Sequence, residues 1–208
     1  MKREEVFNLI YQHNIWGAPE SRSGAGSSLA ATEHIRRELP ILFKDYGVKS
    51  ILDIPCGDLN WMSTIISSDM RYIGADIVDE LISNNQRKYP DIEFRVLDIV
   101  NSVLPEVDLI LCRDCFFHFP LELIFQSLRN IKKSRSKYLL TTNFTWRARR
   151  NVDIPIAKFF GINLMLEPFN FKMPLEMIIE GNTEGEPHLG SQKDRSLCLW
   201  NIDDIPDI

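Results

Sequence analysis

A short apolar strand that ends in an acid and breaks into a glycine-containing turn constrains this chain more than any other feature. It lies between Ser50 and Trp61, in the run SILDIPCGDLNW. The apolar residues suit a strand covered on both faces, and Asp53 places a carboxylate at its carboxyl end. Pro55 and Gly57 then turn the chain. Because ligands bind outside the carboxyl ends of strands in open parallel sheets, we expect the turn from Asp53 to Asp58 to form the floor of a binding site.

Two further segments repeat this arrangement of an apolar strand followed by an acid. They are Arg71–Asp76 (RYIGAD) and Ile92–Asp98 (IEFRVLD). Between them, Asp79–Tyr89 has the length and polarity of a surface helix, with Asp79 as its N-cap and Pro90 as its stop. The order strand, helix, strand is that of a βαβ unit. We therefore expect the acids that end the three strands to meet at one edge of one sheet.

These motifs resemble those of the class I S-adenosylmethionine-dependent methyltransferases. In that family the first strand ends in a D-x-G-C-G-like turn, the second in an acid for the ribose, and the third in an acid near the adenine. The likeness covers about Ser50 to Phe144, with Pro55 where a glycine is usual, which stiffens the turn and removes one backbone donor. A closer likeness is to a bacterial group of small, mostly uncharacterised methyltransferases. It rests on four segments, at Ser23–Ser27 (SGAGS), Asp53–Met62, Leu111–His118 (LCRDCFFH) and Pro168–Phe171 (PFNF).

The resemblance implies an α/β fold, a Rossmann-like doubly wound sheet of seven strands with an N-terminal helical extension. We expect a single methyltransferase domain over residues 1–208, with N-terminal helices and a Gly/Ser loop at 1–47 and the α/β core at 48–208. The last two strands would form an antiparallel hairpin around the polar, Gly-rich segment Gly181–Arg195. The further helices expected are Lys2–His13, a helix from Leu29 capped by Ser27 or Ser28 that Pro40 breaks or restarts toward Tyr46, and Pro120–Ile131; the further strands are Val107–Cys112, Lys137–Thr142, Pro174–Glu180 and Ser196–Ile202.

The chemistry of S-adenosylmethionine matches the acids at the strand ends. Asp76 can accept both ribose hydroxyls, and Asp98 can accept from the adenine amino group. Gly57 lets the backbone approach the cofactor closely. Asp53 and Asp58 would face the ammonium group, or would only cap the following helix. The residues expected to bind the cofactor are Ser23, Gly24, Asp53, Pro55, Gly57, Asp58, Trp61, Asp76, Ile77, Asp98, Ile99 and Arg113.

Two alternatives concern the identity of the nucleotide and the role of the N-terminal loop. A dinucleotide-binding fold needs G-x-G-x-x-G to admit a pyrophosphate, whereas Asp58 in this turn would repel phosphate. The Gly/Ser-rich loop Trp16–Ser28 either folds over the cofactor or is a flexible connector. Trp61 either lines the site or fills the core.

The catalytic candidates follow the fourth strand. Asp114 can orient the acceptor, and His118 can take its proton near neutral pH. Alternatively, His118 packs among the neighbouring phenylalanines and only stabilises the loop. Asn143, placed after the fifth strand, is a second polar candidate. We expect no metal, because Thr142 stands where metal-dependent relatives would need an acid.

Composition and charge indicate the partners and the compartment. The formal net charge is −5 without a long basic block, which argues against a nucleic acid partner. No apolar run reaches the roughly 18 to 20 residues of a membrane span, and the N-terminus is unlike a signal peptide. Cys112 and Cys115 form a C-x-x-C without a second pair, so reduced, buried thiols are expected. These features predict a cytoplasmic protein with no membrane partner and leave its oligomeric state open.

Three functions fit the sequence. The first is a methyltransferase for a small-molecule acceptor, such as the oxygen of a sugar or another hydroxylated metabolite. The second is an aminopropyl-type transferase on the same fold, which the absence of an evident acidic diamine motif disfavours. The third is a non-catalytic interaction protein that retains the fold. The segment Pro168–Phe171 could wall a substrate pocket or support a protein interface.

Overall fold

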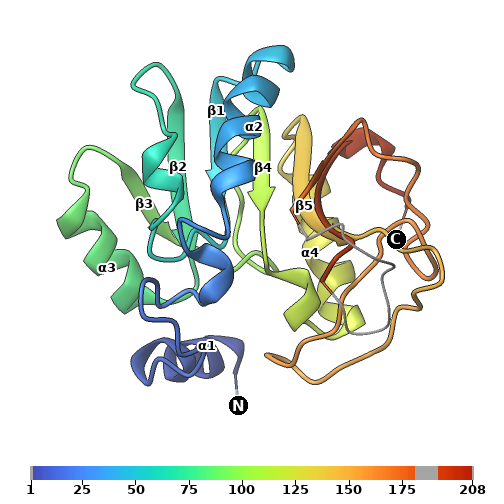
Figure 1. Ribbon diagram of the computed structural model, residues 1–208, viewed down its shortest axis with the longest axis horizontal. Helices are drawn as coiled ribbons and strands as arrows, with labels where there is room; N and C mark the ends of the chain where they lie inside the picture. Colours follow the sequence, from blue (N-terminus) through green and yellow to red (C-terminus); the bar gives the residue numbers. More distant parts are fainter. Residues whose placement is uncertain (1, 181–191, 208) are drawn as a thin grey trace.

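The fold is a seven-stranded mixed sheet with helices on both faces (Figure 1). The computed structural model describes residues 2–180 and 192–207. The strand order is β3-β2-β1-β4-β5-β7-β6; β1 to β5 are parallel, and β7 is antiparallel to both neighbours. This confirms the predicted sheet of seven strands. The strands are β1 (Ser50–Asp53), β2 (Arg71–Asp76), β3 (Glu93–Val96), β4 (Leu109–Cys112), β5 (Tyr138–Phe144), β6 (Glu176–Ile179) and β7 (Arg195–Asn201).

Two hydrophobic cores lie on the two faces of the sheet, because successive strand residues point to opposite sides. Ile51 packs with α2 (Glu33–Asp45) and α3 (Asp79–Lys88) on one face. The next residue, Leu52, packs with α4 (Leu121–Lys133) on the other. Ile51 and Leu52 are both fully buried. The continuous apolar character of β1 therefore follows from cover on both faces.

The first helix, α1 (Arg3–Gln12), belongs to neither layer. It lies across the end of the sheet toward which the arrows of β1 and β4 point (Figure 1). The N-terminal extension thereby covers the carboxyl edge, which is where a site is expected in such a sheet. None of the helices in the described part of the chain is long and apolar enough to cross a membrane.

The predicted helix start at Leu29 is wrong. The chain from 29 to 32 forms turns, in which the Ser28 hydroxyl accepts from the amide of Ala31 at 3.2 Å, and α2 begins only at Glu33. The predicted break at Pro40 is also wrong, since α2 runs through it to Asp45. Proline removes one helical hydrogen bond, but the buried neighbours Leu39, Leu42 and Phe43 hold this helix against the sheet.

Other boundaries differ by a few residues for identifiable reasons. Asp79 is not the N-cap of α3; Val78 occupies that position, and its amide donates to Asp76 Oδ1 at 3.0 Å. The fifth strand extends to Phe144, so Asn143 lies inside it rather than after it. The segment between the last two strands was predicted from 181 to 195, and its residues 181–191 lie outside the described ones.

Candidate functional site

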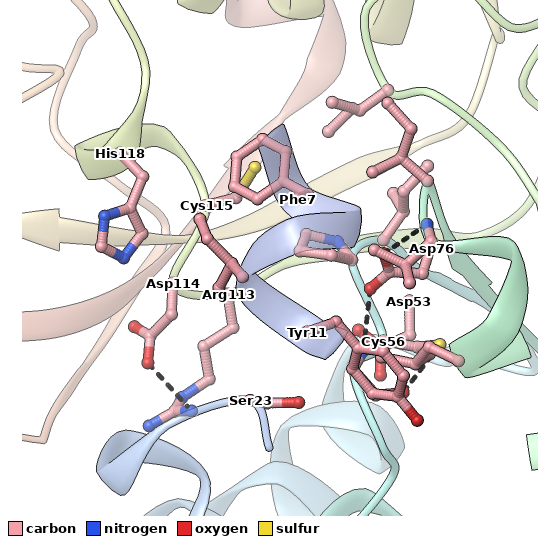
Figure 2. Close-up of a pocket in the computed structure, with 18 of the residues that line it drawn as sticks. Phe7, Tyr11, Ser23, Asp53, Cys56, Asp76, Arg113, Asp114, Cys115 and His118 are labelled. Atoms are coloured by element: carbon pink, nitrogen blue, oxygen red, sulfur yellow. Dashed lines mark hydrogen bonds and ion pairs between the residues drawn. The ribbon is translucent and has the colours of Figure 1, made fainter. Parts of the chain in front are cut away.

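A large pocket lies at the carboxyl edge of the sheet, under α1 (Figure 2). It encloses about 1050 Å³ of empty space, with the open solvent at its mouth included. The predicted residues that line it are Ser23, Asp53, Pro55, Gly57, Trp61, Asp76, Ile77, Asp98, Ile99, Arg113, Asp114 and His118. Gly24 and Asp58 are not lining residues. The lining residues that were not predicted include Arg3, Phe7, Tyr11, Arg22, Cys56 and Cys115.

Asp76 is held rigidly at the end of β2. Its Oδ1 accepts from the amide of Val78 at 3.0 Å, and its Oδ2 accepts from the amide of Gly57 at 3.3 Å. Burial raises the pKa of Asp76 to about 6, against the opposing effect of these amide donors. The carboxylate has no arginine or lysine partner among the described residues. It is therefore a fixed acceptor that a ligand with hydroxyl or cationic groups would satisfy.

Asp53 is the second buried carboxylate, at the end of β1. The side chain is hydrogen-bonded through Oδ2 to the Tyr72 hydroxyl at 2.6 Å, and the residue is 3% exposed. Burial raises the pKa of Asp53 to about 7; the Tyr72 bond and the charge of Arg113 oppose the increase, and Asp76 adds to it. In the described structure Asp53 contacts Tyr72 rather than capping a helix. Figure 2 shows Asp53 and Asp76 on the same side of the pocket.

Asp98 lies just beyond β3 and pairs with the N-terminal helix. Its Oδ2 is 2.6 Å from the guanidinium of Arg3, and its Oδ1 accepts from the amide of Val100 at 2.9 Å. Both members of the ion pair are 20% exposed. The pair fastens the start of α1 over the edge of the sheet. No local sequence signal could have shown that Arg3 would reach an acid in the third strand's loop.

The Gly/Ser-rich loop packs directly on the turn after β1. Asp58 Oδ1 accepts from the Ser21 hydroxyl and Oδ2 from the amide of Arg22, both at 2.9 Å. In return, the amide of Asp58 donates to Ser23 Oγ at 3.1 Å. Gly57 has a φ of +55°, and a Cβ placed there would lie 2.2 Å from Ser23 Oγ. Asp58 thus holds the loop, whereas Gly57 makes room for it.

A charged cluster stands at the ends of β4, β6 and β7. Arg113 donates to Glu180 Oε2 at 3.0 and 2.7 Å and pairs with Asp114 at 3.2 Å. Arg195 bonds the same Asp114 oxygen at 2.6 Å. Burial alone would lower the pKa of Arg113, but the carboxylates of Asp114 and Glu180 outweigh it and the pKa is raised. Arg113 also donates to the Gly26 carbonyl at 2.9 Å, which ties the loop to this cluster.

Asp114 faces this cluster as well as the pocket. Its Oδ1 accepts from the Thr142 hydroxyl at 3.1 Å, so both carboxylate oxygens have protein partners. Its φ is +56°, a strained value for a residue with a side chain. Figure 2 shows Asp114 and His118 on one side of the pocket, with Phe7 between them and Asp76. The negative charge of Asp114 opposes the lowering of the His118 pKa by burial.

His118 has a defined tautomer. Its Nδ1 lies 2.9 Å from the carbonyl oxygen of Lys158. A carbonyl only accepts, so Nδ1 carries the hydrogen and Nε2 of the neutral ring keeps its lone pair. The ring stacks on Trp16 with centroids 5.2 Å apart at 20° and lies 4.5 Å from the Phe117 ring. Burial lowers the pKa of His118, which favours the neutral form near neutral pH.

The remaining candidates have structural environments. Asn143 is fully buried in β5, and its Oδ1 accepts from the amide of Leu164 at 2.7 Å. Its predicted position after the strand was wrong because β5 extends to Phe144, and it does not line the pocket. The four cysteines are free and buried. Among residues 2–180 and 192–207, no three His, Cys, Asp or Glu side chains are grouped to hold a metal ion.

Comparisons with known proteins agree with this architecture. No protein-family model matches the chain. A protein of Invertebrate iridescent virus 6 with the name "Putative methyltransferase 235L" is 27% identical over 192 residues, which cover 86% of this chain and 69% of the viral one.

Two solved structures show the fold. One is magnesium protoporphyrin IX methyltransferase from Synechocystis PCC 6803 with bound SAH; its TM-score is 0.51 at 13% identity, over 67% of this chain and 69% of that chain. The other is human N-acetylserotonin methyltransferase in complex with SAM, with a TM-score of 0.51 at 16% identity, over 73% of this chain and 45% of the human one. The chain has the fold of the class I S-adenosylmethionine-dependent methyltransferases.

Proposed function

We propose that this protein is an S-adenosylmethionine-dependent methyltransferase that acts on a hydroxyl oxygen of a small molecule, such as a sugar or another hydroxylated metabolite. One observation carries the proposal: two buried carboxylates, Asp53 and Asp76, face one pocket of this fold, and neither forms an ion pair with any of the residues that the structure describes. The ribose diol, the ammonium group and the sulfonium centre are the groups that such carboxylates would bind. The structural relatives with bound SAM or SAH support the same choice.

Several residues that line the pocket suit the groups of this cofactor. Asp76 is fixed by two backbone amides, so it would accept the ribose hydroxyls without rearrangement. Asp53 would face the ammonium group. Ile99 and Ile77 also line the pocket and would supply apolar contact for the adenine. Asp98 already forms an ion pair with Arg3. It would therefore accept from the adenine amino group through a carboxylate lone pair that Arg3 does not use.

The chain's own residues would move the proton of the acceptor. When bound, the cofactor supplies a methyl carbon attached to a positively charged sulfur, which takes the electron pair of the broken bond. Nε2 of His118 would accept the hydroxyl proton as the acceptor oxygen forms its bond to carbon. Trp16 and Phe119 line the pocket around His118 and would exclude water. Because the carbon is already activated, alignment of acceptor and donor supplies much of the rate.

The test is calorimetric titration of S-adenosylhomocysteine into the wild-type protein and into Asp76→Ala. We expect binding to the wild type and a loss of roughly 2 to 4 kcal/mol in the variant, about 30-fold to 1000-fold in Kd. Asp91→Ala is the matched control, because Asp91 is exposed in the turn that precedes β3, at the other edge of the sheet. Absent binding to the wild type, or equal affinity in Asp76→Ala, would overturn the proposal.

A further inference from the structure

Three arginines line the pocket, and two of them already have carboxylate partners. Arg3 pairs with Asp98 at 2.6 Å. Arg113 pairs with Asp114 and Glu180 at 3.2 and 2.7 Å. The third is Arg22, for which no ion pair with any acid exists among residues 2–180 and 192–207. Arg22 is therefore the pocket cation that is open to an anionic group of a ligand.

The structure holds Arg22 at both ends. Its amide donates to Asp58 Oδ2 at 2.9 Å, which fixes its backbone beside the turn after β1. Its guanidinium lies over the Tyr11 ring, 5.2 Å from the centroid, and donates to the Tyr11 carbonyl at 3.3 Å. Tyr11 is in turn bonded through its hydroxyl to Asn84 of α3 at 2.9 Å. A ring face and a carbonyl orient the guanidinium while leaving it other donors for a ligand.

We propose that Arg22 binds the carboxylate at the amino-acid end of S-adenosylmethionine. This rests on the proposed function. That end of the cofactor carries an ammonium and a carboxylate, so a site for it needs an unpaired acid and an unpaired cation. Asp53 supplies the acid and Arg22 the cation, and the planar guanidinium suits a carboxylate. The charges of Arg3 and Arg113 are already balanced by carboxylates of the protein, which disfavours both.

A pair of ligands that differ only in this carboxylate isolates the contact. S-adenosylhomocysteine contains it, and S-(5′-adenosyl)-3-thiopropylamine is the same molecule without it. Calorimetry would measure both ligands on the full-length wild type, Arg22→Ala, Arg22→Lys and the control Arg71→Ala. Arg71 is an exposed arginine at the amino end of β2, away from the pocket.

Arg22→Ala is expected to weaken S-adenosylhomocysteine by about 10-fold to 100-fold, the range of one charge-assisted contact, and to change the amine by less than about twofold. Arg22→Lys should recover part of the loss, and Arg71→Ala should lose nothing. Equal loss of both ligands in Arg22→Ala would assign Arg22 to holding Tyr11 and overturn the proposal. Unchanged affinity for both would also overturn it. Failure of the wild type to bind either ligand would instead refute the proposed function, and this inference with it.

Discussion

Replacing Asp53 by Asn should stabilise the protein without ligand, and increasingly so as the pH rises. Burial raises the pKa of Asp53 from an ordinary 3.8 to about 7, so the folded protein keeps a proton that the unfolded chain has already released. In that window the folded state binds more protons, and stability falls as pH rises. The wild type therefore carries a destabilising charge at pH 8 that an asparagine would not.

The magnitude follows from the two pKa values. The raised pKa of Asp53 lowers the unfolding free energy of the wild type by about 4 kcal/mol at pH 8 and by about 1.7 kcal/mol at pH 5. The difference in unfolding free energy between Asp53→Asn and wild type should thus grow by about 2 to 3 kcal/mol from pH 5 to pH 8. A constant cost of the substitution itself cancels in this comparison. Asparagine can still accept from the Tyr72 hydroxyl that Asp53 now engages.

Urea unfolding of both proteins at pH 5, 6, 7 and 8 measures this difference. Asp91→Asn is the control, because that acid is exposed and its replacement should give no pH-dependent gain. A difference between Asp53→Asn and wild type that stays constant or shrinks toward pH 8 would refute the reasoning. It would mean that Asp53 is ionised in the folded protein throughout this range.

Three further outcomes are expected. The affinity for S-adenosylhomocysteine should rise by about 60-fold from pH 5.5 to pH 7, because the pKa of Asp53 is raised to about 7 and that of Asp76 to about 6, and both carboxylates must lose a proton to bind the ligand. Calorimetry in two buffers checks both affinity and proton release, and a flat profile contradicts the prediction. His118→Ala should slow methyl transfer by about 10² to 10⁴-fold with cofactor affinity unchanged, measured as S-adenosylhomocysteine formation with a working acceptor, whereas a wild-type rate would remove His118 as the base. Hydrogen exchange should show that cofactor protects the loop Trp16–Ser28; protection elsewhere in the pocket but not there would leave the loop a connector.

The sheet was predictable because its signals are local. A buried parallel strand reads as a short apolar run, and β1, β2 and β4 each show one followed at once by polar residues. The acids at 53, 76 and 98 were brought to one pocket as expected. Helix ends were less predictable, because a turn and a helix start share the same polar residues. Ser28 accepts an amide in a turn, and Asp76 takes the amide at the start of α3.

The contacts that close the pocket depend on how distant segments dock, which no local pattern records. Arg3 meets Asp98 only because α1 lies across the sheet edge. Arg113 meets Glu180 because β6 joins the sheet through β7. Asp58 looked like a ligand for the cofactor because of its place in the turn. The loop from Ser21 to Ser23 reaches it first.

The most direct test of the account is a crystal structure of the protein grown with S-adenosylhomocysteine. We expect the ligand in the pocket beneath α1, with both ribose hydroxyls within hydrogen-bond distance of the Asp76 carboxylate and the sulfur facing His118. A ligand bound elsewhere, or in this pocket with its ribose away from Asp76, would contradict the central claim.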